Sequence, residues 1–168
     1  MKNYLSALLF IASIAFAGPG QIMQEIVNKV EANSSISALE STLEKHVYID
    51  NIAAQVAGRS AWRSATKADR VNFIAWLKQN LLSYYADTIS NLARYKYSLI
   101  ARESAQRQVL RVQNPNGTSS DLVIFFKKVN GIWYIIDSSF NGISIVAQWK
   151  ARLSNKIKTQ GLSGVTHD

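Results

Sequence analysis

Two apolar runs joined by Asn130-Gly131 constrain the fold of this chain more than any other segment. The runs are Leu122 to Val129 and Ile132 to Ser138, and an Asn-Gly pair between such runs predicts a β-hairpin with a two-residue turn. The expected pairs are Lys128 with Trp133, Phe126 with Ile135 and Ile124 with Asp137 on one face, and Val129 with Ile132, Lys127 with Tyr134 and Phe125 with Ile136 on the other. Both faces are apolar in the middle. Either helices cover both sides of the sheet, or one side lines a hydrophobic hollow.

The rest of the chain predicts two further strands and several helices. Alternation of apolar and polar residues predicts strands over Tyr95 to Arg102 and Gln106 to Gln113, followed by a turn at Asn114 to Gly117. Helices are predicted over Gln21 to Ala32, Ser37 to Lys45, Asn51 to Ala57 (capped by Asp50 and stopped by Gly58), Lys67 to Leu92 (opened by a capping box at Thr66 and Asp69) and Ser144 to Lys158. This order predicts one α+β domain with a four-stranded antiparallel sheet. The helix from Lys67 is apolar around most of its girth, so it must be covered on more than one side.

The first seventeen residues have the pattern of a cleaved secretory signal peptide. Lys2 is a short positive region, Leu5 to Phe16 is apolar, and Ala15-Phe16-Ala17 is a small-x-small cleavage pattern. The apolar run is about a dozen residues, whereas a membrane span needs roughly 20. We therefore expect a signal peptide over residues 1–17 and a single mature domain over residues 18–168, which we expect to be monomeric.

Charge and cysteine usage narrow the compartment and the partners. The sequence has no cysteine and a formal net charge of +8, or +7 once Lys2 is removed with the leader. An exported protein without disulfides fits a bacterial periplasm. A basic balance favours nucleic acid, an anionic membrane surface or an acidic protein as partner, and export disfavours nucleic acid.

Few residues suggest catalysis or metal binding. His46 and Asp50 are four residues apart, but no third metal ligand follows at a useful spacing, and His167 is near the chain end. Ser144 lacks the second glycine of a nucleophile elbow and is better interpreted as the N-cap of the last helix. Asp137 shares its predicted face with Trp133 and Ile135, so it is either a general base in an apolar site or a buried carboxylate with structural hydrogen bonds.

Three stretches together resemble the MlaC family, the periplasmic phospholipid-binding component of the Mla lipid-transport system, whose relatives are called toluene-tolerance proteins. They are DNIAAQVAG at Asp50 to Gly58 followed by Trp62, FIAWLKQNLLSYYA at Phe73 to Ala86, and a W-x-x-x-D strand at Trp133 to Asp137 that continues into Gly142-Ile143-Ser144 and a helix. The resemblance covers about Gln21 to Val165. Lys150 stands where the family usually has Arg.

The resemblance implies a phospholipid carrier without enzymatic activity or cofactor, with the lipid as cargo. Members of the family hold acyl chains in a hydrophobic pocket and shuttle lipid between an outer-membrane lipoprotein complex and an inner-membrane complex of a lipid-binding ring and an ABC transporter, a role in outer-membrane lipid asymmetry. The residues expected to line such a pocket are Phe73, Trp76, Leu77, Leu81, Tyr84, Phe125, Trp133, Ile135, Phe140 and Ile143.

A second set of residues is expected to contact lipid headgroups, a membrane surface or acidic partners. These are Ser144, Lys150, Arg152, Lys156 and Lys158, all at the start of the last helix or along it. Two other functions stay open at this stage. One is a small enzyme of a related cone-shaped fold with Asp137 as general base, and the other is a periplasmic adaptor that binds only protein.

Overall fold

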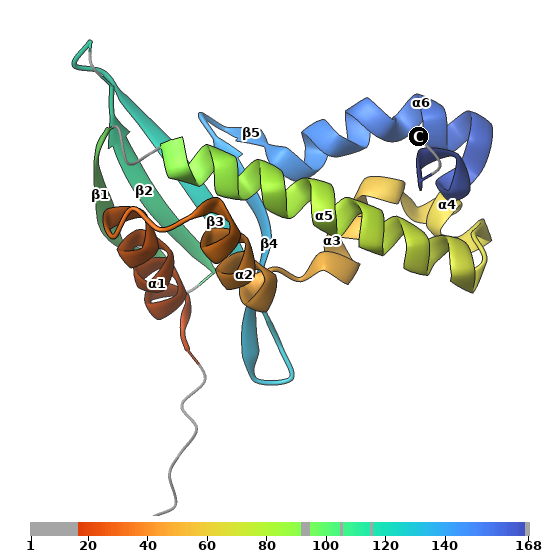
Figure 1. Ribbon diagram of the computed structural model, residues 1–168, viewed down its shortest axis with the longest axis horizontal. Helices are drawn as coiled ribbons and strands as arrows, with labels where there is room; N and C mark the ends of the chain where they lie inside the picture. The colour runs from red at the N-terminus through yellow and green to blue at the C-terminus, as the bar shows by residue number, and fades with distance from the viewer. Residues whose placement is uncertain (1–16, 92–94, 105, 115, 167–168) are drawn as a thin grey trace, which may run out of the picture.

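The computed structural model describes residues 17–91, 95–104, 106–114 and 116–166 (Figure 1). The signal peptide expected over residues 1–17 falls almost entirely outside the described residues, as do Leu92, Pro115 and His167. The helices are α1 (Pro19–Glu31), α2 (Ile36–His46), α3 (Ile49–Ala57), α4 (Arg59–Ser64), α5 (Lys67–Asn91) and α6 (Ile145–Thr166), and the strands are β1 (Lys96–Ser104), β2 (Arg107–Gln113), β3 (Ser119–Val129), β4 (Ile132–Phe140) and β5 (Ile143–Ser144).

The predicted α+β class is confirmed, with one more strand than expected. The sheet is antiparallel throughout and follows the chain in the order β1-β2-β3-β4-β5. The fifth strand has only two residues, and it forms because Asn141 and Gly142 adopt φ angles of 49° and 81° and turn the chain back onto β4. Such a tight turn requires positive φ at both central residues, which Asn and Gly tolerate.

Of the N-terminal caps predicted for α3 and α5, the structure contains the one on α5 but not the one on α3. Thr66 and Asp69 form the predicted capping box, because the Asp69 N–H donates to Thr66 Oγ1 at 3.1 Å and the Thr66 N–H donates to Asp69 Oδ2 at 3.3 Å. The prediction that Asp50 caps α3 is wrong. The helix begins at Ile49 with Tyr48 as N-cap, and the Tyr48 N–H donates to the Ile135 carbonyl at 2.8 Å, which ties the α2–α3 junction to β4.

The β3–β4 hairpin contains a bulge that the sequence did not reveal. From Val129–Ile132 to Phe126–Ile135 the pairs are as predicted, but Phe125 then pairs with Asp137 and Ile124 with Ser138. One extra residue, Ile136, therefore lies between the two pairings. The bulge moves Asp137 off the face that carries Ile135, and it corrects the predicted pairs of Phe125 with Ile136 and of Ile124 with Asp137.

The molecule has two ends joined by α5 (Figure 1). We call the sheet end the five strands with α1, α2 and the C-terminal part of α5, and the helical end α3, α4, α6 and the N-terminal part of α5. At the helical end, the Phe73, Leu77 and Leu81 side chains are 0% exposed. Gly161, with φ of 70°, kinks α6 and allows its last turns to fold back over this core. Among the described residues, no helix combines the length and hydrophobicity that crossing a bilayer requires.

Candidate functional site

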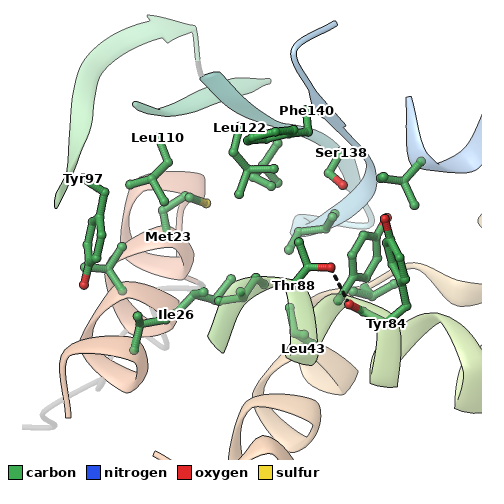
Figure 2. A pocket seen from close by; sticks show the side chains of 18 residues that line it. Met23, Ile26, Leu43, Tyr84, Thr88, Tyr97, Leu110, Leu122, Ser138 and Phe140 are labelled. Atoms are coloured by element: carbon green, nitrogen blue, oxygen red, sulfur yellow. Dashed lines mark hydrogen bonds between the residues drawn. The ribbon is translucent and has the colours of Figure 1, made fainter. Parts of the chain in front are cut away.

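An apolar pocket lies at the sheet end, between the inner face of the sheet and the helices that cover it (Figure 2). Its cavity volume is about 120 Å³. It is lined by Met23, Ile26, Val27 and Val30 from α1, Leu43 and Val47 from α2 and the junction after it, Tyr84, Tyr85, Thr88 and Ile89 from α5, Tyr97, Leu110, Leu122, Ile124, Ile135, Ser138 and Phe140 from the sheet, and Ile145 from α6. A concave, mostly apolar cavity with few polar groups is typical of a ligand site.

The mouth of this pocket is marked by the lining residues that reach solvent. Tyr84 on α5 is 42% exposed and Phe140 at the end of β4 is 40% exposed, whereas most of the other lining residues are buried. Thr88 lies one turn after Tyr84 and donates a hydrogen bond from Oγ1 to the Tyr84 carbonyl at 2.8 Å (Figure 2). The pocket therefore opens between α5 and the C-terminal end of β4.

Tyr85 places a buried hydroxyl at the pocket wall. Its Oη atom has no hydrogen-bond partner within bonding distance and angle among the described residues. Burial raises the pKa of Tyr85 far above its ordinary value of 10.0, and the nearby Ser138 hydroxyl acts in the opposite direction. The phenol is therefore neutral at physiological pH, which suits an uncharged, apolar site.

Three of the ten residues predicted to bind lipid line this pocket. They are Tyr84, Ile135 and Phe140. Tyr84 and Phe140 stand at its mouth, and Ile135 lies inside on β4, 3% exposed. The structure brings these three together from α5 and β4, elements that are far apart in the chain.

Four of the ten lie at the helical end. Phe73, Leu77 and Leu81 are fully buried in the core there. The Trp76 ring stacks on Phe73 with 6.2 Å between ring centroids and meets Trp149 of α6 edge-on at 6.0 Å. The apolar stripe of α5 is continuous, but only its last turns, from Tyr84 to Ile89, reach the pocket.

The remaining three lie around the sheet. Trp133 packs against the core beneath Lys128, whose Nζ is 5.8 Å from the ring centroid. Phe125 lines a groove with Arg107 and Arg111, away from the pocket. Ile143 pairs with Phe140 at the edge of the sheet and is 59% exposed. Lipid contact by each of the ten residues stays a prediction.

Sequence analysis missed the side chains of α1 and of β2 and β3 in the pocket wall. The face of α1 that carries Ile26, Val27 and Val30 was recognisable as apolar, but nothing in its spacing showed that it covers a cavity instead of closing a core. Leu110 and Leu122 are register partners on neighbouring strands, so they enter the pocket side by side.

The residues predicted to contact headgroups or partners do not form one patch, because they lie on different surfaces of α6. Arg152 lies in a groove with Tyr84 and Trp149, and its guanidinium carbon is 5.4 Å from the Trp149 ring centroid. Lys150 and Lys158 lie along a groove between α4 and α6. Lys156 is half-buried on the same helix. Ser144 caps α6 as predicted, accepting a hydrogen bond from the Ala147 N–H at 3.0 Å.

Asp137 has both carboxylate oxygens engaged at the start of α6. Oδ1 accepts hydrogen bonds from the Ser138 N–H at 2.7 Å and the Val146 N–H at 3.1 Å, and Oδ2 accepts one from the Ser144 hydroxyl at 2.6 Å. These bonds satisfy an amide of the first helical turn that lacks an intrahelical partner. The arrangement fits a structural carboxylate that fixes α6 on β4.

His46 and Asp50 do not share a helix face. His46 ends α2, Asp50 lies in the first turn of α3, and the His46 Nε2 atom is 2.9 Å from Glu25 Oε2 of α1. The imidazole thus links α1 to α2 at the covering layer of the sheet end.

Comparisons with known proteins agree with this architecture. A family model described as MlaC protein matches residues 21–168. No curated protein matches the chain. Among solved structures, a phospholipid-binding protein from Ralstonia solanacearum, determined in complex with a phospholipid, matches with a TM-score of 0.69 and 18% sequence identity, over 89% of this chain and 93% of that chain. At that identity, the similarity shows a shared fold.

Proposed function

From the premise that this chain belongs to the MlaC family, we propose that it is a periplasmic phospholipid carrier. In this proposal the acyl chains occupy the apolar pocket of the sheet end and the headgroup remains at the mouth, near Tyr84 and Phe140. The observation that carries the proposal is the pocket itself, an almost wholly apolar cavity with two lining residues, Tyr84 and Phe140, exposed to solvent. The phospholipid bound to the structural relative from Ralstonia solanacearum supports the same ligand class.

The energetics of lipid transfer require such a pocket. At ~0.8 kcal/mol per methylene, a diacyl lipid with about thirty methylenes loses roughly 24 kcal/mol when its chains are exposed to water. A carrier in water must therefore cover nearly all of both chains. A pocket lined mainly by side chains such as Met23, Leu110 and Leu122 offers that cover with few polar groups in its wall.

The pocket must widen when cargo enters. Its volume of about 120 Å³ is in the range of a cavity that holds a benzene-sized molecule. Two acyl chains need several times that space. We expect α1, which contributes four apolar side chains to the wall, to move away from the sheet as the chains enter.

The destinations that we propose for the cargo are those expected of the family. We propose that the protein shuttles lipid between an outer-membrane lipoprotein complex and an inner-membrane transporter complex. The formal net charge of +8 and the lysines along α6 favour encounter with acidic surfaces. Binding to such partners should therefore weaken as salt concentration rises.

Native mass spectrometry of protein purified from the periplasm without detergent tests this proposal, followed by solvent extraction and lipid analysis. We expect stoichiometric phospholipid. Leu110→Trp, which fills the pocket, should reduce the bound lipid, whereas the control Val71→Trp on the exposed face of α5 should not. A folded wild-type protein without lipid would contradict the proposal and favour an adaptor or an enzyme.

A further inference from the structure

Three exposed apolar side chains form a lip at the pocket mouth. The mouth lip consists of Tyr84 on α5, Phe140 at the end of β4 and Ile143 on β5, which are 42%, 40% and 59% exposed. Phe140 and Ile143 are register partners on antiparallel strands, so their side chains lie on the same face of the sheet. The pocket-facing surface of the sheet therefore continues past the cavity to its outer edge, where it is open to water.

The lip stands on a short, well-defined hairpin. The two-residue turn at Asn141 and Gly142 joins β4 to β5, and the Asn141 N–H donates to the Asp121 carbonyl at 3.1 Å. On the far side of β5, the Asp137 and Ser144 hydrogen bonds fix the start of α6. Ile143 is thus held outward at a fixed position instead of collapsing onto the core.

Arginines flank the lip on two sides. On the α6 side, Arg152 lies against the Trp149 ring in a groove that shares Tyr84 and Ile145 with the pocket. On the outer side of the sheet, Arg107 and Arg111 line a groove that includes Asn141 and Gly142 of the hairpin turn. Arg111 forms an ion pair with Asp121, so the positive charge on which the inference relies is that of Arg152, on the α6 side.

We propose that the mouth lip docks on the surface of an anionic bilayer, so that lipid passes between the pocket and a membrane without crossing open water. This inference rests on the proposed carrier function. Exposed Tyr, Phe and Ile side chains next to Arg152 and Trp149 match the composition of surfaces that enter the headgroup region of anionic membranes. The position of these residues around the opening through which acyl chains must pass favours a lipid surface over a protein partner.

Vesicle flotation with the full mature protein tests the inference. The vesicles are phosphatidylcholine alone, or phosphatidylcholine with about a third phosphatidylglycerol to supply anionic surface charge. We expect wild-type protein to float with the anionic vesicles. Because burying a large aliphatic side chain contributes about 1.5–3 kcal/mol, Ile143→Ser should weaken vesicle binding about tenfold or more.

Two further variants make the result specific. Val71→Ser removes a similarly exposed apolar side chain, at 55%, from the helical end and should leave vesicle binding unchanged. Arg152→Gln should weaken binding to the anionic vesicles more than to the neutral ones, and added salt should reduce that difference.

Vesicle binding and cargo content are measured separately, so that the two proposals fail in different ways. Wild-type protein that carries phospholipid but does not bind either kind of vesicle would overturn the docking inference alone. The mouth lip would then be better explained as a contact surface for a protein partner. Equal binding by wild type and Ile143→Ser would also overturn it. Wild-type protein that carries no phospholipid would overturn the carrier function itself.

Discussion

The two ends of the molecule use the same helix in opposite ways. At the helical end, α5 buries Phe73, Leu77 and Leu81 completely, and the helix as a whole packs against α2, α3 and α6. At the sheet end, its continuation through Tyr85 and Ile89 faces a cavity. The two halves of α5 differ in the surface that they face. At the helical end other helices pack closely against α5, whereas at the sheet end the sheet and α1 leave a cavity beside it. Hydrophobic periodicity therefore identifies the buried face of a helix without showing whether that face meets a core or a ligand.

Truncating one leucine at each end should give the largest contrast. Leu77→Ala leaves a new void in a close-packed core and should lower the free energy of unfolding by about 2–5 kcal/mol. Leu110→Ala should cost less, because part of the removed side chain borders an existing cavity and has fewer packing partners. Urea unfolding with comparison of m values measures both. Equal losses would mean that the sheet end is packed as tightly as the helical end.

Asp137 makes a second connection between the two ends, because it lies on β4 and bonds to the start of α6. Asp137→Ala removes three hydrogen bonds, two of them at the start of α6, and leaves the Val146 N–H without its acceptor. We therefore expect the free energy of unfolding, measured with urea, to fall by about 1–3 kcal/mol.

Asp137→Asn separates this structural role from catalysis. The amide keeps one acceptor oxygen, so the variant should unfold less easily than Asp137→Ala and should retain bound phospholipid. Loss of an enzymatic turnover in the Asn variant, with its stability intact, would contradict the structural role.

The pocket wall should tolerate loss of its buried hydroxyl. Tyr85→Phe removes an unpaired polar atom, so stability at neutral pH should change by less than about 1 kcal/mol or increase slightly. The pKa of Tyr85 is raised in the folded state, so its contribution to stability is fully present below the ordinary pKa of 10.0 and is lost as pH rises toward the folded value. The stability of the variant should therefore fall less steeply above pH 10 in alkaline unfolding curves. Identical curves would show that the hydroxyl is solvated.

The smallest effect is expected on the outer face of the sheet. Arg111 donates two hydrogen bonds to Asp121, at 2.8 and 3.0 Å, and holds the pKa of that carboxyl below its ordinary value of 3.8. The pair therefore stabilises the fold above that pH, and the contribution is lost as pH falls through the folded pKa. Asp121→Asn should slightly flatten the acid branch of the stability curve, because exposed ion pairs contribute little. A large change in the acid branch would contradict this expectation and would mean that the exposed Arg111–Asp121 ion pair contributes substantially to the stability of the fold.

The sequence allowed the fold to be predicted well because its signals are local. The Asn130-Gly131 turn, the Thr66 capping box and the length of α5 each depend on neighbouring residues, and each appears in the structure. Ser144 was identified as the N-cap of α6 for the same reason.

The candidate site was predicted less well because it depends on long-range geometry. The bulge at Ile136 reverses which β4 side chains face the pocket, so Asp137 lies on the opposite face from Ile135. No glycine, proline or other turn residue at this position indicated the bulge in the sequence. Phe125, Leu77 and Leu81 are as apolar as the residues that line the cavity, so composition alone did not separate the two groups. The position of the cavity follows from how α1, α2 and α5 pack against the sheet, which is a long-range property of the fold.

Photocrosslinking tests the central claim, that acyl chains enter the sheet end, most directly. Purified protein is loaded with a phospholipid that carries a diazirine at the end of one acyl chain, irradiated, digested and analysed by mass spectrometry. We expect adducts on the residues that line the pocket, within Met23 to Val30 of α1 and at Leu110, Leu122 and Ile124 of β2 and β3. Adducts concentrated on Phe73 to Leu81 would contradict the account and place the lipid in the helical end.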